Sequence, residues 1–225
     1  MSNSPLVDFT LISPNSTNPR NKKISKITIH HMAGNATVEQ CGNVFQPKSR
    51  QASSNYGVGT DGRVGMYVEE KNRSWASSSP ANDHMAVTIE VANDGGPNWH
   101  VSDKALEKTI ELCTDICKRN GIKELKFTGD KNGNLTMHRY FAATACPGDY
   151  LASKFPYIAD EVNKRLGVKK TNPAKPGELT SVNDIVWELH HRGIITDKNL
   201  WLKKLNEDTN AYWLARKVVN LTTNK

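Results

Sequence analysis

The stretch Leu-Thr-Met-His-Arg-Tyr-Phe-Ala-Ala-Thr-Ala-Cys-Pro-Gly, residues 135–148, separates an imidazole, His138, from a thiol, Cys146, by seven residues. Far upstream, a run dense in β-branched residues ends at the tandem pair His30-His31. Such a run predicts a strand. Because successive side chains of a strand point to opposite faces, only one residue of this pair can readily face the same site as His138 and Cys146.

Two histidines and one cysteine form a ligand set typical of Zn(II). Three protein ligands leave one coordination position open for water, and this open position distinguishes a catalytic zinc site from a structural one. The cysteine must bind as its thiolate, which the metal itself favours. A single His or Cys is more often a core or surface residue, so the hypothesis depends on the combination of His30, His138 and Cys146.

The periodicity of the chain predicts a mixed α/β fold, in which a mixed central β-sheet is flanked by helices. The expected elements are a strand at 24–29, a short helix at 38–45, a hairpin at 56–68 turned by Asp61-Gly62, a strand at 86–92, a helix from Ser102 to near Gly121, and a last helix to about residue 166. Pro156 indicates that this last helix begins near Ser153, which leaves Leu151 in the segment before it. Residues 1–23, rich in Asn, Ser and Pro, predict a loosely attached arm.

A length of 225 residues favours one main domain with a small appendage. We expect a catalytic domain at 1–166 with its core at about 23–166, a polar linker at 167–178, and a small three-helix module at 179–225. The expected helix caps of the module are Ser181, Thr196, and either Asp208 or Thr209. A core of this size is marginally stable alone.

The net charge of +7 and the pI near 9.2 favour an anionic partner, which could be nucleic acid, a membrane surface or an anionic cell-wall polymer. Nucleic acid is the weakest of the three, because no helix-turn-helix, zinc-finger or RNP-like motif is found. No apolar stretch approaches the ~20 residues of a membrane span. The N-terminus has no signal-peptide pattern, so we expect cytoplasmic synthesis and reduced thiols, with Cys113 and Cys117 in the core.

Four phrases in order, ITIHHMAG, SSNYGVGTDGRV, VTIEVAND and LTMHRYFAATACPGDYL, resemble the type 2 N-acetylmuramoyl-L-alanine amidases. This family is shared by phage endolysins, bacterial amidases and animal peptidoglycan recognition proteins. The resemblance covers about residues 23–166. It implies a zinc site formed by His30, His138 and Cys146 with water in the fourth position, and it places His31 beside or behind the site rather than on the metal.

The same resemblance suggests two further catalytic residues. Glu90 corresponds to the general base of some bacterial members, although it could also be a solvated charge near a strand end. Thr144 corresponds to the group that steadies the oxyanion, although a turn-forming hydroxyl is nearly as good an interpretation. Some relatives use a hairpin Tyr instead, and counting back from the turn puts Ser54 at that place here, which shifts weight to Glu90.

The remaining candidate residues are ones that could contact the substrate. In the substrate groove these are His31, Asn55, Trp75, His84 and Asn93, each of which could equally be structural. In the tail, Trp187, Trp201, Tyr212 and Trp213 could stack on sugars, although helical spacing favours core positions for Trp187 and Trp213. Residues 168–225 hold ten Lys and Arg against six Asp and Glu, a balance that suits an anionic wall.

The resemblance implies a zinc-dependent hydrolase of the amide bond between N-acetylmuramic acid and L-alanine in peptidoglycan. The domain plan resembles a phage or prophage endolysin of a Gram-positive host, which is made in the cytoplasm and reaches the wall after a holin opens the membrane. The alternative is a recognition protein that binds peptidoglycan without cutting it. The tail could be a dimerisation element instead of a wall binder, and the oligomeric state stays open.

Overall fold

The computed structural model describes residues 2–168, 182–191 and 194–208, together with Ala211, Leu214, Ala215 and Val218. The chain divides into two compact units, Met1–Val168 and Lys169–Lys225, which are described separately. Among the described residues, no helix is both long enough and apolar enough to cross a membrane.

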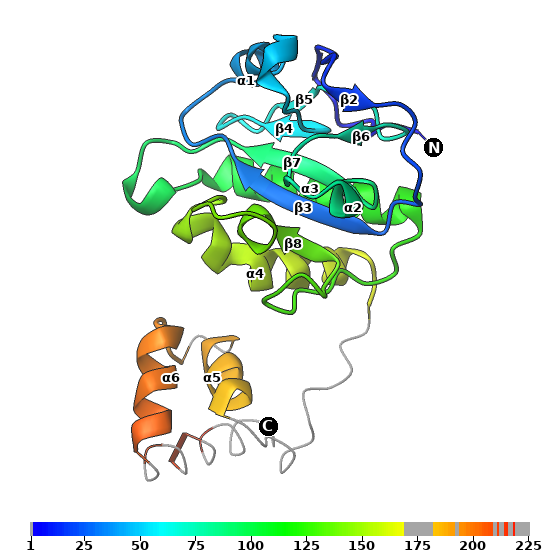
Figure 1. Ribbon diagram of the computed structural model, residues 1–225. Coiled ribbons are helices and arrows are strands. Elements are labelled where there is room, and N and C mark those ends of the chain that lie inside the picture. Colours follow the sequence, from blue (N-terminus) through cyan, green and yellow to red (C-terminus); the bar gives the residue numbers. More distant parts are fainter. Residues whose placement is uncertain are drawn as a thin grey trace. The chain divides into compact units, whose positions relative to one another are not determined.

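A six-stranded mixed sheet organises the first unit (Figure 1). Its strands, in spatial order, are β1 (Phe9–Thr10), β5 (Val64–Met66), β4 (Tyr56–Val58), β7 (Ala86–Val91), β3 (Lys26–His31) and β8 (Leu135–Met137). Neighbours in this order pair in parallel except β4 and β5, which form the expected hairpin. A separate antiparallel pair joins β2 (Ser16–Thr17) to β6 (Arg73–Ser74). The predicted mixed α/β class is confirmed.

Two long helices, α3 (Asp103–Asn120) and α4 (Asp149–Arg165), cover one face of this sheet (Figure 1). Ile27, Ile29 and Ile89 point toward them and are fully buried in the main core. The residues that alternate with these isoleucines therefore face away from α3 and α4.

The shorter elements are α1 (Val38–Val44), α2 (Pro80–Asp83) and the 3₁₀ turns η1 (Lys48–Arg50), η2 (Pro97–Trp99) and η3 (His138–Tyr140).

Local signals locate α3 well and α4 less well. The Ser102 hydroxyl caps α3 by accepting from the N–H of Ala105, and Gly121 ends the helix at a φ of 69°, as expected. The predicted start of α4 near Ser153 is wrong, because the helix begins at Asp149 and contains Pro156 in its interior. Leu151 is 0% exposed, and its burial favours an additional helical turn on the N-terminal side of the start that Pro156 indicated.

The loosely attached arm predicted for residues 1–23 is also wrong. Strand β1 pairs with β5, and the side chain of Arg20 is only 6% exposed. Its guanidinium donates hydrogen bonds to backbone carbonyls of Glu70, Asn72, Asp83, His84 and Ala86. Burial lowers the pKa of Arg20 to about 10, so the side chain stays charged at neutral pH. One cation thus joins the N-terminal segment to the loop before β6, the end of α2 and the start of β7.

In the second unit the described helices are α5 (Val182–His191) and α6 (Lys198–Glu207). Their apolar residues form a small core of Ile185, Val186, Leu189, Ile195, Leu205 and Ala215. The predicted cap at Thr196 is wrong, because Asp197 caps α6 by accepting from the N–H of Leu200. Ahead of the third predicted helix, Asp208 accepts from the N–H of Ala211.

Of the predicted sugar-stacking residues in this unit, only Trp201 has a described side chain. It is partly buried against the small core, and Lys204 Nζ lies 5.4 Å from its ring centroid in a cation–π contact. The side chain of Trp187, all of Tyr212 and Trp213, the Ser181 cap and most of the linker lie outside the described residues.

Candidate metal centre and active site

The two candidate histidine ligands are brought together by parallel strand pairing. His30 lies on β3 and pairs in register with Glu90 of β7. On the other side of β3, Ile29 pairs with Met137, the last residue of β8, so His138 emerges beside His30. The two imidazole centroids are 4.7 Å apart, and the ring planes are inclined by 52°.

Cys146 reaches the same place from the loop between β8 and α4. Ligand atoms of His30, His138 and Cys146 all lie within 4.8 Å of one another, close enough to hold one metal ion. Nε2 of His30 and Nε2 of His138 are buried and have no hydrogen-bond partner. A histidine and cysteine donor set with unengaged ring nitrogens fits Zn(II).

The protonation of these groups is also compatible with a metal. Burial, together with neighbouring His138 and His31, lowers the pKa of His30 to about 3, so its imidazole is neutral and able to act as a ligand. Burial and the charge of Glu90 raise the pKa of Cys146 to about 12, although the His31 backbone and Arg139 oppose this rise. A thiolate at this position therefore requires a nearby cation, which a metal ion provides.

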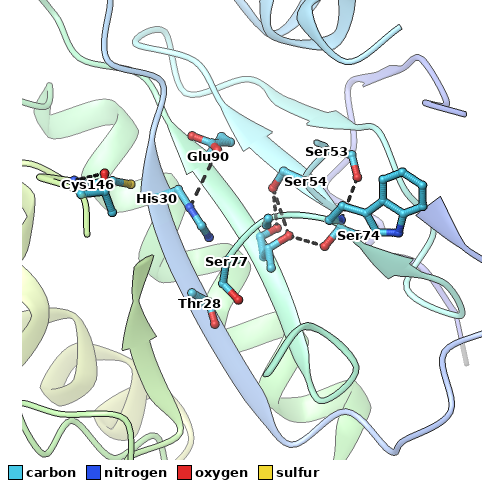
Figure 2. A network of polar contacts seen from close by, with 12 residues as sticks. Thr28, His30, Ser53, Ser54, Ser74, Ser77, Glu90 and Cys146 are labelled. Carbon is cyan, nitrogen blue, oxygen red and sulfur yellow. Dashed lines mark hydrogen bonds and ion pairs between the residues drawn. The ribbon is translucent and has the colours of Figure 1, made fainter. Parts of the chain in front are cut away.

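Glu90 faces this group from the neighbouring strand (Figure 2). One carboxylate oxygen, Oε1, lies 4.0 Å from Nδ1 of His30, and the side chain is 16% exposed. Burial raises the pKa of Glu90 to about 8, against a smaller opposing effect of Arg50. The pKa of His30 is about 3, so its imidazole is neutral in the pH range where Glu90 titrates. The contact is therefore not an ion pair, and the carboxyl group remains free to exchange a proton.

A buried polar layer lies on the face of the sheet that carries His30 and Glu90 (Figure 2). Thr28 and Thr136 share a hydrogen bond of 2.9 Å between their hydroxyls, and the Thr88 hydroxyl is 2.7 Å from that of Ser74. Ser54, which stands where a catalytic Tyr was considered, is 0% exposed and donates to the Thr88 carbonyl. Ser54 therefore belongs to the supporting layer rather than to the accessible site.

Thr144 lies on the exposed part of the loop that carries Cys146. Its hydroxyl oxygen accepts a hydrogen bond of 3.2 Å from the N–H of Cys146. Thr144 thus forms the turn that the alternative interpretation expected, and its hydroxyl proton is not used in that contact.

His31 and Asn93 lie next to the candidate ligands without joining them. His31 points to the opposite face from His30, and its ring meets Trp99 edge-on at 5.2 Å between centroids. Asn93 is buried, and its amide donates to the Trp99 carbonyl at 2.8 Å. Both residues are close to the site, and their predicted contact with substrate stays a prediction.

The other three predicted groove residues are engaged elsewhere. Asn55 is 0% exposed, and its amide bonds to Val68 and Thr88, so its position gives no support to substrate contact. Nε1 of Trp75 donates to the Thr17 hydroxyl, and Nδ1 of His84 accepts from the N–H of Asn21. Trp75 and His84 are partly exposed, so a contact with substrate stays a prediction for both.

The sequence patterns did not single out Arg139, which wraps around the backbone of the Cys146 loop. Its Nε donates to the Cys146 carbonyl at 3.3 Å, and its Nη2 donates to the Ala145 carbonyl at 2.5 Å. The available signal was its place directly after His138.

Comparisons with solved structures show the fold of the first unit. The structure of PlyL superposes with a TM-score of 0.54 at 16% identity, covering 68% of this chain and 95% of that one. A mutant endolysin from Bacillus subtilis gives 0.53 at 16% identity, covering 69% of this chain and 99% of that one. The N-acetylmuramoyl-L-alanine amidase LysC from Clostridium intestinale URNW gives 0.50 at 21% identity, covering 72% of this chain and 96% of that one.

A search of curated protein sequences found no match. The family model described as N-acetylmuramoyl-L-alanine amidase matches residues 20–149, which include both candidate histidine ligands, Cys146 and Glu90. This match spans more than half of the chain, and the chain belongs to the N-acetylmuramoyl-L-alanine amidase family.

Proposed function

We propose that this protein is a zinc-dependent amidase that cleaves the bond between the lactyl group of N-acetylmuramic acid and the first L-alanine of the stem peptide. The observation that carries the proposal is the meeting of His30, His138 and Cys146 within 4.8 Å, inside the part of the chain that the amidase family covers. Peptidoglycan amidase activity follows from the family, whereas the metal and the roles of single residues are our inference.

His30, His138 and Cys146 would hold the zinc ion. When bound, zinc acts as a Lewis acid on the scissile carbonyl and makes water a better nucleophile near neutral pH. The two histidines extend from paired parallel strands, so their spacing is fixed by the backbone rather than by flexible loops. This rigidity favours a site that keeps its geometry during turnover.

Glu90 accepts the proton of the attacking water and returns it to the leaving amine of L-alanine. Its carboxylate extends from β7, faces the ligand group and has a pKa raised to about 8 by burial. General acid and base catalysis is most efficient when the pKa of the catalytic group lies near the working pH. Thr144, whose hydroxyl proton is not engaged with Cys146, donates to the developing oxyanion.

We further propose that the protein acts as a phage or prophage endolysin, in which the second unit binds the cell wall. The support is the division into two compact units and the partly buried Trp201 beside Lys204, an aromatic and basic pair suited to an anionic glycan polymer. A weak wall binder joined to the catalytic unit raises its effective concentration at the substrate. Release to the wall would follow holin action after synthesis in the cytoplasm.

Removal of zinc should abolish the turbidity loss of purified cell walls, because the scissile carbonyl is then no longer polarised. Adding Zn(II) after chelation should restore lysis in the wild type but not in Cys146→Ser. Cys41→Ser, which alters a buried thiol outside the ligand group, is the matched control and should recover with the wild type. Lysis that persists in the chelated protein would contradict a metal hydrolase, and wall binding without lysis at any zinc level would favour a recognition protein.

Glu90→Gln should keep the shape of the side chain and the zinc content, but lower kcat by about 10²- to 10⁴-fold, because the amide cannot take up the proton. Glu124→Gln, at an exposed carboxylate remote from the ligand group, is the control. In the same assay Thr144→Val should lose rate while Thr144→Ser retains it. A Glu90→Gln enzyme close to wild-type rate would assign the proton transfer to another group.

Deletion of residues 169–225 should leave a folded first unit that cleaves soluble muropeptides at the wild-type rate, since the main core lies within residues 24–162. Lysis of intact cells should fall, because the truncated protein has lost its binding to the wall. Both activities are measured on the same preparation, together with co-sedimentation on walls. A truncated protein that sediments and lyses like the full chain would contradict the wall-binding role.

A further inference from the structure

Cys146 differs from the other two candidate ligands in how it is held. His30 lies on β3, and His138 directly follows β8, so paired strands fix both imidazoles. Cys146 lies in the loop between β8 and α4, where no strand partner holds it. The thiol is hydrogen-bonded to the His31 backbone, and contacts within the loop hold the backbone around Cys146.

Most of these contacts come from Arg139. Its backbone N–H donates to the Cys146 carbonyl at 3.2 Å, and its side-chain Nε donates to the same carbonyl at 3.3 Å. Its Nη2 donates to the Ala145 carbonyl at 2.5 Å. One residue at the start of the loop thus binds two successive carbonyls at its end and closes the loop on itself.

The chemistry of this contact requires a guanidinium. Its donors are fixed in a planar fork, so Nε and Nη2 can serve two adjacent carbonyls at once, whereas a lysine ammonium is a single flexible point charge. The guanidinium also approaches Asp149 at 3.3 Å. Asp149 is 88% exposed, however, and an ion pair with so exposed a partner contributes little. The carbonyl contacts are therefore the main structural role of the Arg139 side chain.

We propose that Arg139 is a positioning residue that holds Cys146 at metal-binding distance and thereby sets the affinity of the site for zinc. In this role Arg139 acts through the backbone of residues 145 and 146, whose carbonyls its guanidinium binds. The proposal rests on the zinc site of the proposed function. It adds to that site a residue at the start of the loop that binds the backbone at the end of the same loop.

The test is metal affinity, measured by competition with a chromophoric chelator, together with the sulfur-to-metal charge-transfer absorption of the Co(II)-substituted protein. Arg139→Ala should bind Zn(II) about 10- to 100-fold more weakly, the usual effect of removing a residue that orients a metal ligand. Its charge-transfer absorption should also weaken. Arg139→Lys should lose affinity too, because one ammonium cannot serve both carbonyls, and this variant decides the question if Arg139→Ala does not fold.

Arg165→Ala is the matched control. Arg165 is 30% exposed, like Arg139, and its guanidinium also contacts a carboxylate, that of Glu107, so its loss should leave metal affinity unchanged. Thermal unfolding in the presence of a chelator should be similar for the Arg139 and Arg165 variants. Arg139 variants within twofold of wild-type affinity would overturn the proposal, whereas a wild-type protein that binds neither Zn(II) nor Co(II) would instead overturn the zinc site itself.

Discussion

Strand β3 pairs in parallel with β7 on one side and β8 on the other, and this pairing fixes the relative positions of the candidate site residues. It puts the carboxyl ends of three strands at one edge of the sheet, and each end positions one side chain of the candidate site. His30 and Glu90 stand opposite each other in register, and His138 follows the third strand. A shift of one residue in either pairing would turn these side chains to the opposite face.

Because successive side chains of a strand point to opposite faces, the residues that form the core and the residues of the candidate site lie on different faces of the sheet. One face of β3 and β7 carries isoleucines that bury against α3 and α4, while the other face carries threonines and then the candidate catalytic groups. The hydroxyls of Thr28, Thr88 and Thr136 are hydrogen-bonded, so this polar face can be buried without leaving those hydroxyls unsatisfied. A rigid polar support beneath the ligands is what a preorganised site requires.

Signals in neighbouring residues were sufficient to predict the helices and strands whose ends depend on nearby residues alone. The β-branched run before His30, the Ser102 cap and the terminal Gly121 were sufficient to locate β3 and α3. The structural role of Arg20 could not be predicted, because its carbonyl partners lie 50 to 66 residues further along the chain. Tertiary burial of Leu151 likewise overrode the proline signal at the start of α4.

The candidate site was predictable in its residue types and only partly in its arrangement. Resemblance to the amidases pointed to His30, His138, Cys146 and Glu90, and the structure brings these four together. It could not reveal that Asn55 is buried, or that Arg139 binds the Cys146 loop, because both facts depend on hydrogen bonds that form only in the folded chain.

Hydrolysis of the amide bond between the glycan strand and the stem peptide can be tested by mass spectrometry of peptidoglycan digested by the zinc-loaded protein. Free stem peptides with a new N-terminal alanine, and glycan strands of unchanged length, are expected. New reducing sugar ends, or cuts within the stem peptide, would contradict amidase activity.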